Sequence, residues 1–419
     1  MRVNKADLLD IAIWVLIAFY TLVAHWIWVA RGIQETVIIA LLAIAIISRA
    51  SFKIKTSQIA MLASIIVLTA EVIFSTFNAS STDYFVQDLK AMLGCFLSFI
   101  YLFQFRRLKY DTFQKFSGIV LKFLNYYTVF NHLLIMVQSK IPYFLMNRSA
   151  IESVNNSLYF DQLTGFLGVN GTTRWSMVTI LVIVLNFSVA IEKKSKRFLY
   201  YNIALIATSV YIATVNSARA FFILMPLTLV LFFIYAASLN WTRKIKIIFG
   251  AFIVLSLFFV AYMYNSSVNS YVNTLIEDKF NVYISWNVDD MIAANDDRAI
   301  AVDFAVRNGG AFGMGIGYIP MHSSNEEVTY LGLNSASSFI YMIGIVGYFL
   351  YAVTLTLIVV SRKSNRWSKL IVFTAYIVVT SYLLPVFSSI ALMFSFAYIL
   401  SLLDYQNKND SRIIKFRVF

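Results

Sequence analysis

The chain has 419 residues, of which 60% are apolar and only 13% are charged, and its mean hydropathy is +0.73. A soluble protein of this length would need far more charge on its surface, so the composition excludes that class and predicts an integral membrane protein. The single cysteine, Cys95, excludes a disulfide within the chain and a cysteine-based metal site. We expect no cofactor and no metal ion.

Apolar stretches recur along the whole chain, and a membrane span takes about 20 apolar residues. The first stretch is too long for a signal peptide and a second follows at once, so we interpret it as a retained helix. The predicted fold is one all-α polytopic membrane domain over residues 1–419, with about twelve transmembrane helices. The predicted spans are 8–30, 33–48, 58–77, 86–105, 115–138, 174–192, 198–216, 220–239, 247–264, 335–360, 369–385 and 387–403.

The basic residues gather on one side of this predicted topology. That side, which includes both termini, carries 25 of the 34 lysines and arginines and 6 acidic residues, whereas the other side carries 9 basic and 15 acidic residues. The two net charges, +19 and −6, return the formal +13. Cytoplasmic loops are enriched in Lys and Arg, so both termini are predicted in the cytoplasm. The basic excess sets topology, and we expect no nucleic-acid partner.

Two predicted connections are much longer than the rest, and both fall on the outer side, at 139–173 and 265–334. Long loops without a domain of their own usually carry function. Within the second loop, apolar residues followed by a Gly-Gly pair predict a surface helix over 296–308. Asp303 and Arg307 stand four residues apart in this helix, so we expect them to form an ion pair.

Three arginines lie close to predicted helix starts on the outer side: Arg174, Arg219 and Arg298. A helix start offers unpaired N–H groups and the positive end of the helix dipole, which suits an anion and above all a phosphate. A guanidinium adds a planar fork that can bond two phosphate oxygens. The alternative is that these arginines are only the outward-reaching ends of their helices. Because arginine is disfavoured on the outer side, we favour the anion-binding role.

Other ionisable side chains have simpler interpretations. Glu71 and Lys90 both lie inside predicted spans, where unpaired charge is costly, so we expect them to pair with each other. His132 has apolar neighbours and is expected to pack. His322 lies in the long outer loop near two glutamates and is the one histidine in a position suited to a general base.

Three outer segments together resemble the bacterial polysaccharide polymerases of the Wzy type and, more distantly, the related O-antigen ligases. The first is Thr164–Gly168 leading to Arg174, and the second is Asn216-Ser217-Ala218-Arg219. The third runs from Arg298 through the Gly-x-Gly-x-Gly of Phe312–Tyr318 to Asn334, before a predicted span. The resemblance concerns the order and outer placement of these motifs and the architecture of the whole chain.

The resemblance implies a membrane glycosyltransferase of GT-C-like architecture in the bacterial cytoplasmic membrane. Its substrates would be polyprenyl-diphosphate-linked oligosaccharides, such as those on undecaprenyl diphosphate, joined into O-antigen or capsular polysaccharide on the outer face. A flippase and a chain-length regulator are the partners it implies. The implied catalytic residues are Arg174, Arg219 and Arg298, with His322 the candidate base from the residues themselves. The implied substrate-binding residues are Ser217, Gly313, Gly315, Gly317 and Asn334.

Two other functions stay open at the level of sequence. A ligase that transfers glycan to another acceptor is the nearer alternative. Ligases usually have a histidine beside the asparagine that begins the helix after the long loop, whereas Leu333 precedes Asn334 here, so we favour a polymerase. A flippase for the same lipid-linked units would also have about twelve helices. Transporters are often built from repeated halves with polar sites at mid-membrane, and neither feature is visible in this sequence.

Overall fold

A computed structural model describes most of the chain and contains twelve α-helices within the ranges that it describes. Three short helical turns join or precede them. The described residues are 5–24, 31–48, 58–77, 85–105, 110–141, 144–146, 163–168, 171–216, 218–235, 297–317, 331, 334–360, 367–387 and 390–404.

Helices occupy eleven of the twelve predicted stretches, and the remaining stretch, 247–264, lies outside the described residues. The helices are α1 (Lys5–Phe19), α2 (Arg31–Ile47), α3 (Ile59–Phe77), α4 (Phe85–Ile100), α5 (Tyr110–Gln138), α7 (Thr172–Lys193), α8 (Lys196–Val215), α9 (Arg219–Tyr235), α14 (Asp297–Gly309), α16 (Ser335–Val360), α17 (Trp367–Leu383) and α18 (Ile390–Asp404). The short turns are η1 (Tyr20–Ala24), η3 (Tyr101–Phe105) and η5 (Gly165–Leu167).

Five of the described helices are long and apolar enough to cross a membrane: α3, α7 and α8, the part of α5 from Gly118 to Gln138, and α16. Helix α3 carries large apolar side chains on its exposed face. Ile66 is 68% exposed and Phe77 86% exposed, which would be unfavourable in water and is normal against lipid. The chain thus has the character of a helical membrane protein.

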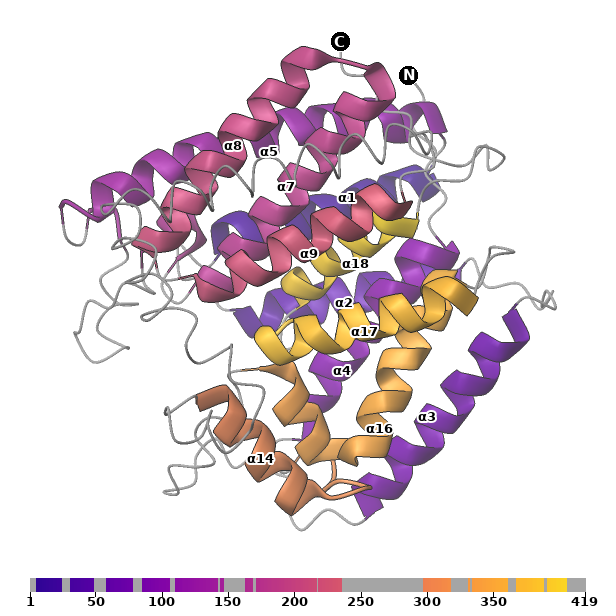
Figure 1. Cartoon of the computed structure of the whole chain (residues 1–419). Helices are drawn as coiled ribbons and strands as arrows, with labels where there is room; N and C mark the ends of the chain where they lie inside the picture. The colour runs from indigo at the N-terminus through magenta and orange to yellow at the C-terminus, as the bar shows by residue number, and fades with distance from the viewer. Residues whose placement is uncertain are drawn as a thin grey trace.

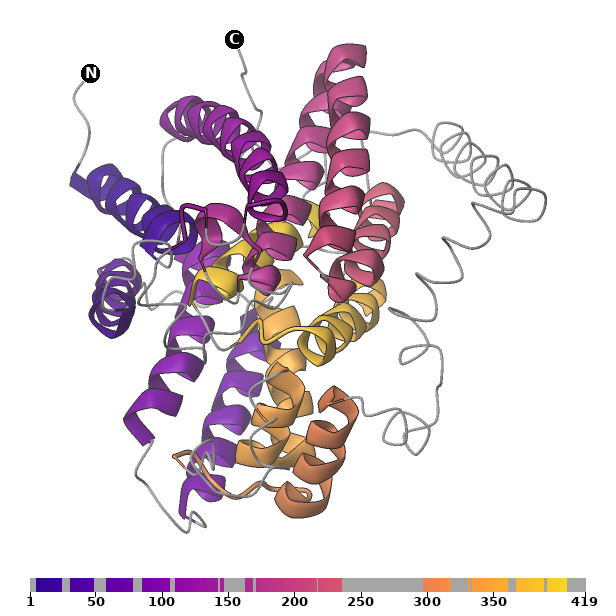
Figure 2. The ribbon, with the colours of Figure 1, turned by 90° about the vertical axis from the view of Figure 1, so that its left-hand side faces the viewer.

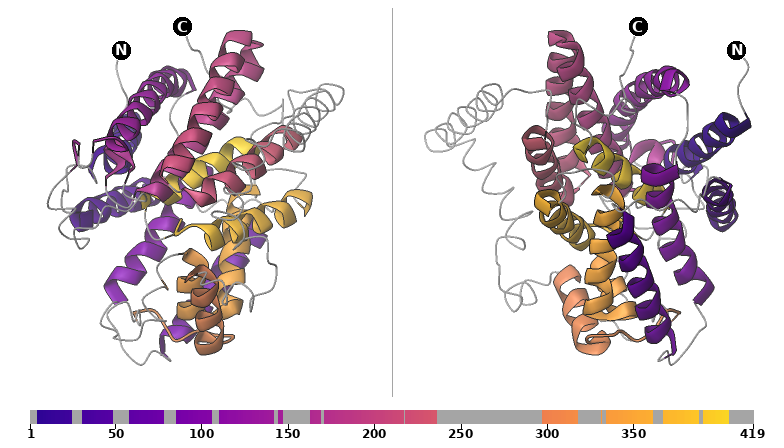
Figure 3. Two further views of the ribbon diagram at one scale, coloured as in Figure 1. Left: turned by 60° about the vertical axis from the view of Figure 1, so that its left-hand side comes forward. Right: turned by 90° about the vertical axis from the view of Figure 1, so that its right-hand side faces the viewer.

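Helix α7 lies at the centre of one half of the molecule, where it packs against α5, α8, α9 and α18 (Figures 1 and 2). Most of its length is buried, although its sequence is less apolar than that of the exposed α3. The other half is built around α16, which packs against α14, α3 and α17. Figure 3 shows α3 standing beside α16 at the edge of the bundle.

Helix α16 is two helices joined at Gly344, whose φ of 73° and ψ of 174° are not helical. The ribbon changes direction at this point (Figure 1). The part before Gly344 runs beside α14, as the stacked rings of Phe304 and Tyr341 show. The part after it contacts α17, where the Tyr348 hydroxyl lies 2.5 Å from Ser381 Oγ. The predicted uninterrupted span 335–360 therefore holds a sharp bend.

A helix was expected at residues 296–308, and α14 covers Asp297–Gly309. The expected ion pair inside it is confirmed, because Arg307 Nε lies 2.8 Å from Asp303 Oδ2.

The predicted pair between Glu71 and Lys90 is wrong. Lys90 Nζ lies 3.2 Å from Glu35 Oε2, and the Tyr20 hydroxyl donates a second hydrogen bond to the same carboxylate. The reason lies in helix packing, because α4 packs against α2, whereas α3 packs against α16. Adjacent helices in the sequence are therefore not adjacent in space at this point.

Candidate functional site

Arg174 is the third residue of α7 and is only 8% exposed. One terminal nitrogen of its guanidinium donates a hydrogen bond to the Leu167 carbonyl oxygen at 3.0 Å. The side chain therefore holds its positive charge in a largely enclosed place, at the helix end where the dipole is also positive. Two positive influences at one buried point favour an anion there.

The segment around Leu167 is held on α5 by amide side chains. Asn131 Oδ1 accepts a hydrogen bond from the Phe166 N–H at 2.7 Å, and its Nδ2 donates to the Thr164 carbonyl at 3.3 Å. Gln138 Oε1 accepts from the Gly165 N–H at 3.1 Å. Gly165 has a φ of +65°, and a Cβ there would clash with the Asn131 amide. The sequence analysis missed Asn131 and Gln138, although amides seven residues apart on one face of an apolar helix were a visible signal.

Buried aromatic side chains join α5 to the first turns of α7 and α9. The ring centroids of His132 and Trp175 lie 5.8 Å apart, and those of Trp175 and Phe221 lie 5.0 Å apart. His132 is 4% exposed, so it packs as the sequence predicted. Within the described part of the chain, however, His132 Nε2 and Trp175 Nε1 are buried without a hydrogen-bond partner. These two buried nitrogens are therefore unsatisfied hydrogen-bonding groups near the start of α7.

Asn216, the first residue of the predicted Asn216-Ser217-Ala218-Arg219 motif, follows the last residue of α8. Its side chain is fully buried, and neither its oxygen nor its nitrogen bonds another described residue. Asn202 Nδ2 donates to the Ile183 carbonyl at 2.9 Å, which sets the depth of α8 against the antiparallel α7. Asn216 lies fourteen residues after Asn202, and residue 169 lies fourteen residues before Ile183. Because the helices are antiparallel, Asn216 lies at about the level of residue 169, three residues before α7 begins. Asn216 thus lies at the end of the bundle where α7 begins, close to the depth of Arg174.

The start of α9 reaches the same end of the molecule. Arg219 is its first residue, as predicted, and Ser217 lies outside the described residues. Thr228 Oγ1 and the Tyr376 hydroxyl lie 2.6 Å apart and fix the depth of α9 against the antiparallel α17. Arg219 lies nine residues before Thr228, and Pro385 lies nine residues after Tyr376. Because the two helices are antiparallel, Arg219 and Pro385 lie at about the same level.

The start of α16 is anchored to this level too. The Ser335 N–H donates to the Leu384 carbonyl at 3.3 Å, and the Phe387 N–H donates to Ser335 Oγ at 2.8 Å. The preceding residue, Asn334, caps α16, because its Oδ1 accepts from the Ser337 N–H at 2.7 Å. Its Nδ2 donates to the Arg298 carbonyl at 3.4 Å. A fully buried Asn334 therefore ties the first turn of α14 to the first turn of α16.

The glycines of the predicted Gly-x-Gly-x-Gly motif lie against the break in α16. The N–H groups of Met314 and Gly315 donate to the carbonyls of Tyr341 and Met342, at 2.8 and 2.9 Å. The N–H groups of Ile345 and Val346 donate to the carbonyls of Gly310 and Ala311, both at 3.1 Å. A break in a helix leaves backbone N–H and C=O groups without partners inside the helix, and these four bonds provide partners for them. We call this pairing the glycine interlock.

The interlock requires glycine because the two backbones touch. A Cβ on Gly313 would clash with the Met342 carbonyl, and a Cβ on Gly344 would clash with the Ala311 carbonyl. At the far end of the segment, the Gly317 N–H donates to the buried carboxylate of Asp88 at 3.1 Å. A Cβ on Gly317 would lie 2.8 Å from the Phe85 Cα. In this structure the three predicted glycines join α14 to α16 and α4, which is a role that the sequence analysis did not assign to them.

These elements bring the starts of α7, α9, α14 and α16 to one end of the molecule, and three of the four have an arginine in the first turn (Figure 1). The backbone thus places Arg174, Arg219 and Arg298 at the same end, whereas His322 lies outside the described residues. Among the described residues, no three His, Cys, Asp or Glu side chains come together as a metal site would require. The arrangement is suited to holding an anion with polar groups beside it.

Comparison with known proteins adds no relative: no family model matches the chain, and a search of curated proteins finds no match for it.

Proposed function

We propose that this chain is a membrane glycosyltransferase that polymerises polyprenyl-diphosphate-linked oligosaccharides into O-antigen or capsular polysaccharide on the outer face of the bacterial cytoplasmic membrane. One observation supports the proposal most strongly: the starts of α7, α9 and α14 lie at the same end of the bundle, each with an arginine in its first turn. The resemblance of the three outer motifs to Wzy-type polymerases supports the same function.

The chemistry of glycan transfer explains why such an end is useful. The bond between the sugar and the lipid diphosphate breaks as the acceptor hydroxyl forms a new bond to the same carbon. Negative charge then develops on the departing diphosphate, and fixed cations and helix dipoles stabilise that charge. The proton of the acceptor hydroxyl passes to a base, for which His322 remains our candidate. Asn216 and His132 carry buried polar atoms without hydrogen-bond partners among the described residues, which are of the kind that bond sugar hydroxyl groups.

Twelve spans, a GT-C-like architecture and cytoplasmic termini are part of the proposal, supported by the charge distribution. Orientation can be tested with a thiol reagent that does not cross membranes, because the native Cys95 is fully buried. Asn308 on α14 and Lys196 at the start of α8 are both exposed. In intact spheroplasts we expect Asn308→Cys to react and Lys196→Cys to react only after lysis. The opposite pattern would place the arginines in the cytoplasm and contradict the proposal.

The function itself is tested by glycan profiles from a strain that lacks the chain and expresses variants of it. We expect Arg219→Ala and Arg298→Ala to leave surface lipid with single repeat units, because losing one such contact costs about 2–4 kcal/mol of transition-state stabilisation, roughly a hundredfold or more in rate. Lysine keeps the charge but loses the planar fork, so Arg219→Lys and Arg298→Lys should recover part of the polymer.

Arg307→Ala is the matched control, because it removes an arginine from the same helix as Arg298, but one that is exposed and paired with Asp303. It should leave polymer length unchanged. Full-length polymer from both Arg→Ala variants, at membrane levels equal to wild type, would contradict the mechanism. Loss of all glycan transfer would indicate a ligase instead, and glycan trapped inside the cell would indicate a flippase.

The break in α16 is the one observation that favours the flippase as a second candidate, since transporters often bind substrates at broken helices. In transporters the freed backbone groups face the substrate. Here the carbonyls of Tyr341 and Met342 and the N–H groups of Ile345 and Val346 all bond the glycine segment. The break therefore serves internal packing, and we favour the polymerase.

A further inference from the structure

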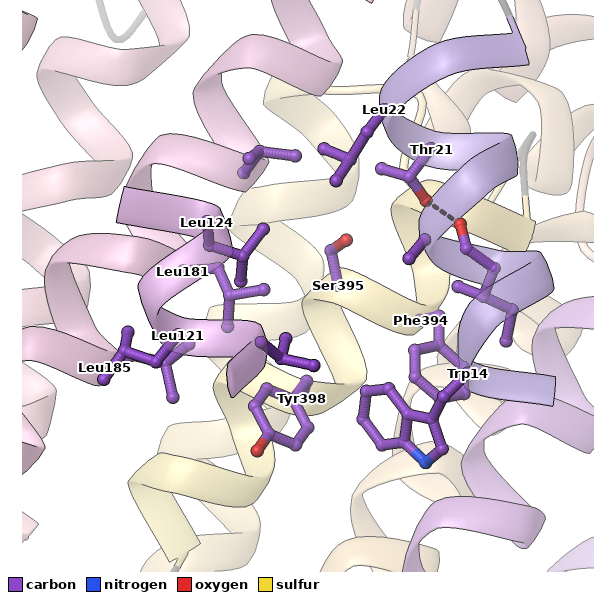
Figure 4. Close-up of a pocket in the computed structure, with 14 residues that line it drawn as sticks. Trp14, Thr21, Leu22, Leu121, Leu124, Leu181, Leu185, Phe394, Ser395 and Tyr398 are labelled. Carbon is purple, nitrogen blue, oxygen red and sulfur yellow. Dashed lines mark hydrogen bonds between the residues drawn. The ribbon is translucent and has the colours of Figure 1, made fainter. Parts of the chain in front are cut away.

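An apolar groove opens between α1, α5, α7 and α18, with about 80 Å³ of space that a water-sized molecule could occupy and an open side towards the surroundings. Figure 4 shows its lining, in which leucines of α5 and α7 face Trp14 and Phe394 across the gap. Among its few polar groups, the Thr21 hydroxyl donates to the Ile17 carbonyl of its own helix at 2.7 Å. The groove therefore suits a hydrocarbon chain and offers little to a polar solute.

The groove leads towards Arg174 along a single face of α7. Val178, Leu181 and Leu185 line it, and they follow Arg174 at intervals of four, three and four residues, which keeps all four side chains on one stripe of the helix. At a rise of about 1.5 Å per residue, the stripe from Arg174 to Leu185 is roughly 16 Å long. That length is about half of a bilayer's hydrocarbon core. A chain in the groove would therefore lie in one leaflet, with its head beside Arg174.

The outer end of the groove is marked by Leu22, whose carbonyl accepts a hydrogen bond from the Tyr127 hydroxyl at 2.8 Å. That hydroxyl lies within electrostatic reach of Arg174. An apolar channel that ends at a buried cation matches an amphiphile with an anionic head and a hydrocarbon tail. The positive charge of Arg174 thus favours a lipid with an anionic head over an uncharged lipid.

We propose that the groove between α1, α5, α7 and α18 holds the isoprenoid tail of a lipid-diphosphate substrate, with the diphosphate beside Arg174. This assignment rests on the proposed function and adds where the lipid lies and which helices contact it. An ordinary phospholipid is the occupant that the experiment must exclude.

A photoreactive residue in the groove provides the test. Benzoylphenylalanine is placed at Leu181 in otherwise wild-type protein, in phosphatidylglycerol nanodiscs that contain radiolabelled undecaprenyl diphosphate. We expect labelling that saturates and that unlabelled undecaprenyl diphosphate, but not an equal amount of phosphatidic acid, suppresses. The matched control carries the same residue at Ile66, which is 68% exposed on α3. Equal labelling at both positions, or equal competition by phosphatidic acid, would overturn the proposal.

Filling the groove gives an independent readout. Ala18 lines the groove, and Ala18→Phe should reduce labelling at Leu181 by about tenfold, since overpacking costs at least 1 kcal/mol or so. Ala60→Phe makes the same change on the exposed surface of α3 and should leave labelling unchanged. An unchanged signal in a well-folded Ala18→Phe variant, with its size-exclusion profile intact, would also overturn the assignment.

Uncharged undecaprenol separates this proposal from the proposed function. If both are right, Arg174→Gln weakens labelling by undecaprenyl diphosphate and leaves labelling by undecaprenol unchanged. If only the groove is right, Arg174→Gln still weakens labelling by undecaprenyl diphosphate, whereas Arg219→Ala and Arg298→Ala make full-length polymer. If both probes label Leu181 equally and Arg174→Gln has no effect, the placement of the diphosphate beside Arg174 is overturned. If only the function is right, the arginine variants lose polymer while Leu181 remains unlabelled.

Discussion

Two short segments of this protein are attached to neighbouring helices by different kinds of contact. Residues 310–317 attach to the break in α16 through backbone hydrogen bonds, and glycines let the two backbones approach. Residues 163–168 attach to α5 mainly through the side chains of Asn131 and Gln138. Both segments stand next to a helix with an arginine in its first turn.

The difference determines how each segment can change. An attachment through backbone hydrogen bonds tolerates most side-chain substitutions, but the glycines at the contact points cannot be replaced by a residue with a Cβ. A side-chain attachment tolerates changes of its own backbone sequence but depends on particular amides. The glycine interlock should therefore be sensitive to added atoms, and the Asn131 attachment to removed ones.

The largest effect is expected from Gly344→Ala. The φ of +73° disfavours any side chain, and the new Cβ would clash with the Ala311 carbonyl, so we expect a loss of about 3–5 kcal/mol in unfolding free energy. Gly310→Ala is the control, because its φ is +57° but nothing lies within 4 Å of the added Cβ. It should cost only about 1–2 kcal/mol. Thermal unfolding in detergent measures both, and equal losses would show that no close approach exists at Gly344.

The next effect is expected from Asn131→Ala. This change leaves the Phe166 N–H and the Thr164 carbonyl buried without their present partner, at a cost of about 2–3 kcal/mol. Asn308→Ala is the same substitution on the exposed face of α14, where Nδ2 only contacts the Phe304 carbonyl of its own helix. We expect it to cost less than about 0.5 kcal/mol. If Asn308→Ala proves as costly as Asn131→Ala in the same unfolding assay, the side-chain attachment is not what stabilises residues 163–168.

A smaller effect should distinguish two roles of Asn334. As the cap of α16, it can be replaced by aspartate, which also accepts the Ser337 N–H bond and suits the helix dipole. Asn334→Ala should then cost about 1 kcal/mol, and Asn334→Asp should recover only part of that loss, because a carboxylate cannot donate the bond that Nδ2 makes to the Arg298 carbonyl. Polymer length in cells provides the second measurement. If Asn334→Asp folds normally but makes no polymer, the side chain has a role in substrate binding beyond the cap.

The smallest effect is expected from the ion pair on the surface of α14. Arg307 and Asp303 are joined at 2.8 Å, but the arginine side chain is 71% exposed. Such a pair contributes about 0.3–0.5 kcal/mol. Asp303→Asn should therefore lower the unfolding temperature only slightly, and added salt should remove the difference. A larger loss that persists in high salt would mean that α14 depends on this pair more than on its packing against α16.

The sequence predicted the helices well because their signals are local. Apolar runs located the eleven described stretches, and a Gly-Gly pair ended α14 one residue from where it was expected. Arg219 and Arg298 stand at helix starts as predicted, since hydropathy and small residues mark those boundaries. These features depend on neighbours along the chain.

Features that depend on packing between helices could not be predicted in the same way. Lys90 pairs with Glu35 because α4 lies against α2, and nothing in either helix alone indicates that. The bend at Gly344 was hidden within a long apolar run, because hydropathy does not register a backbone angle. The glycines near residue 315 were expected to contact substrate, and only the position of α16 reveals their structural contacts.

The glycine interlock also constrains how this chain is made. The second part of α16 presents Ile345 and Val346 N–H groups that are bonded by residues 310 and 311, which are synthesised before them. A segment that enters a bilayer with unbonded N–H groups incurs a cost that lipid does not relieve. We therefore expect residues 310–317 to be in place when the helix after Gly344 forms, so that α14 and α16 behave as one unit during biogenesis. Grafting or deleting either of them alone should yield a chain that quality-control proteases remove.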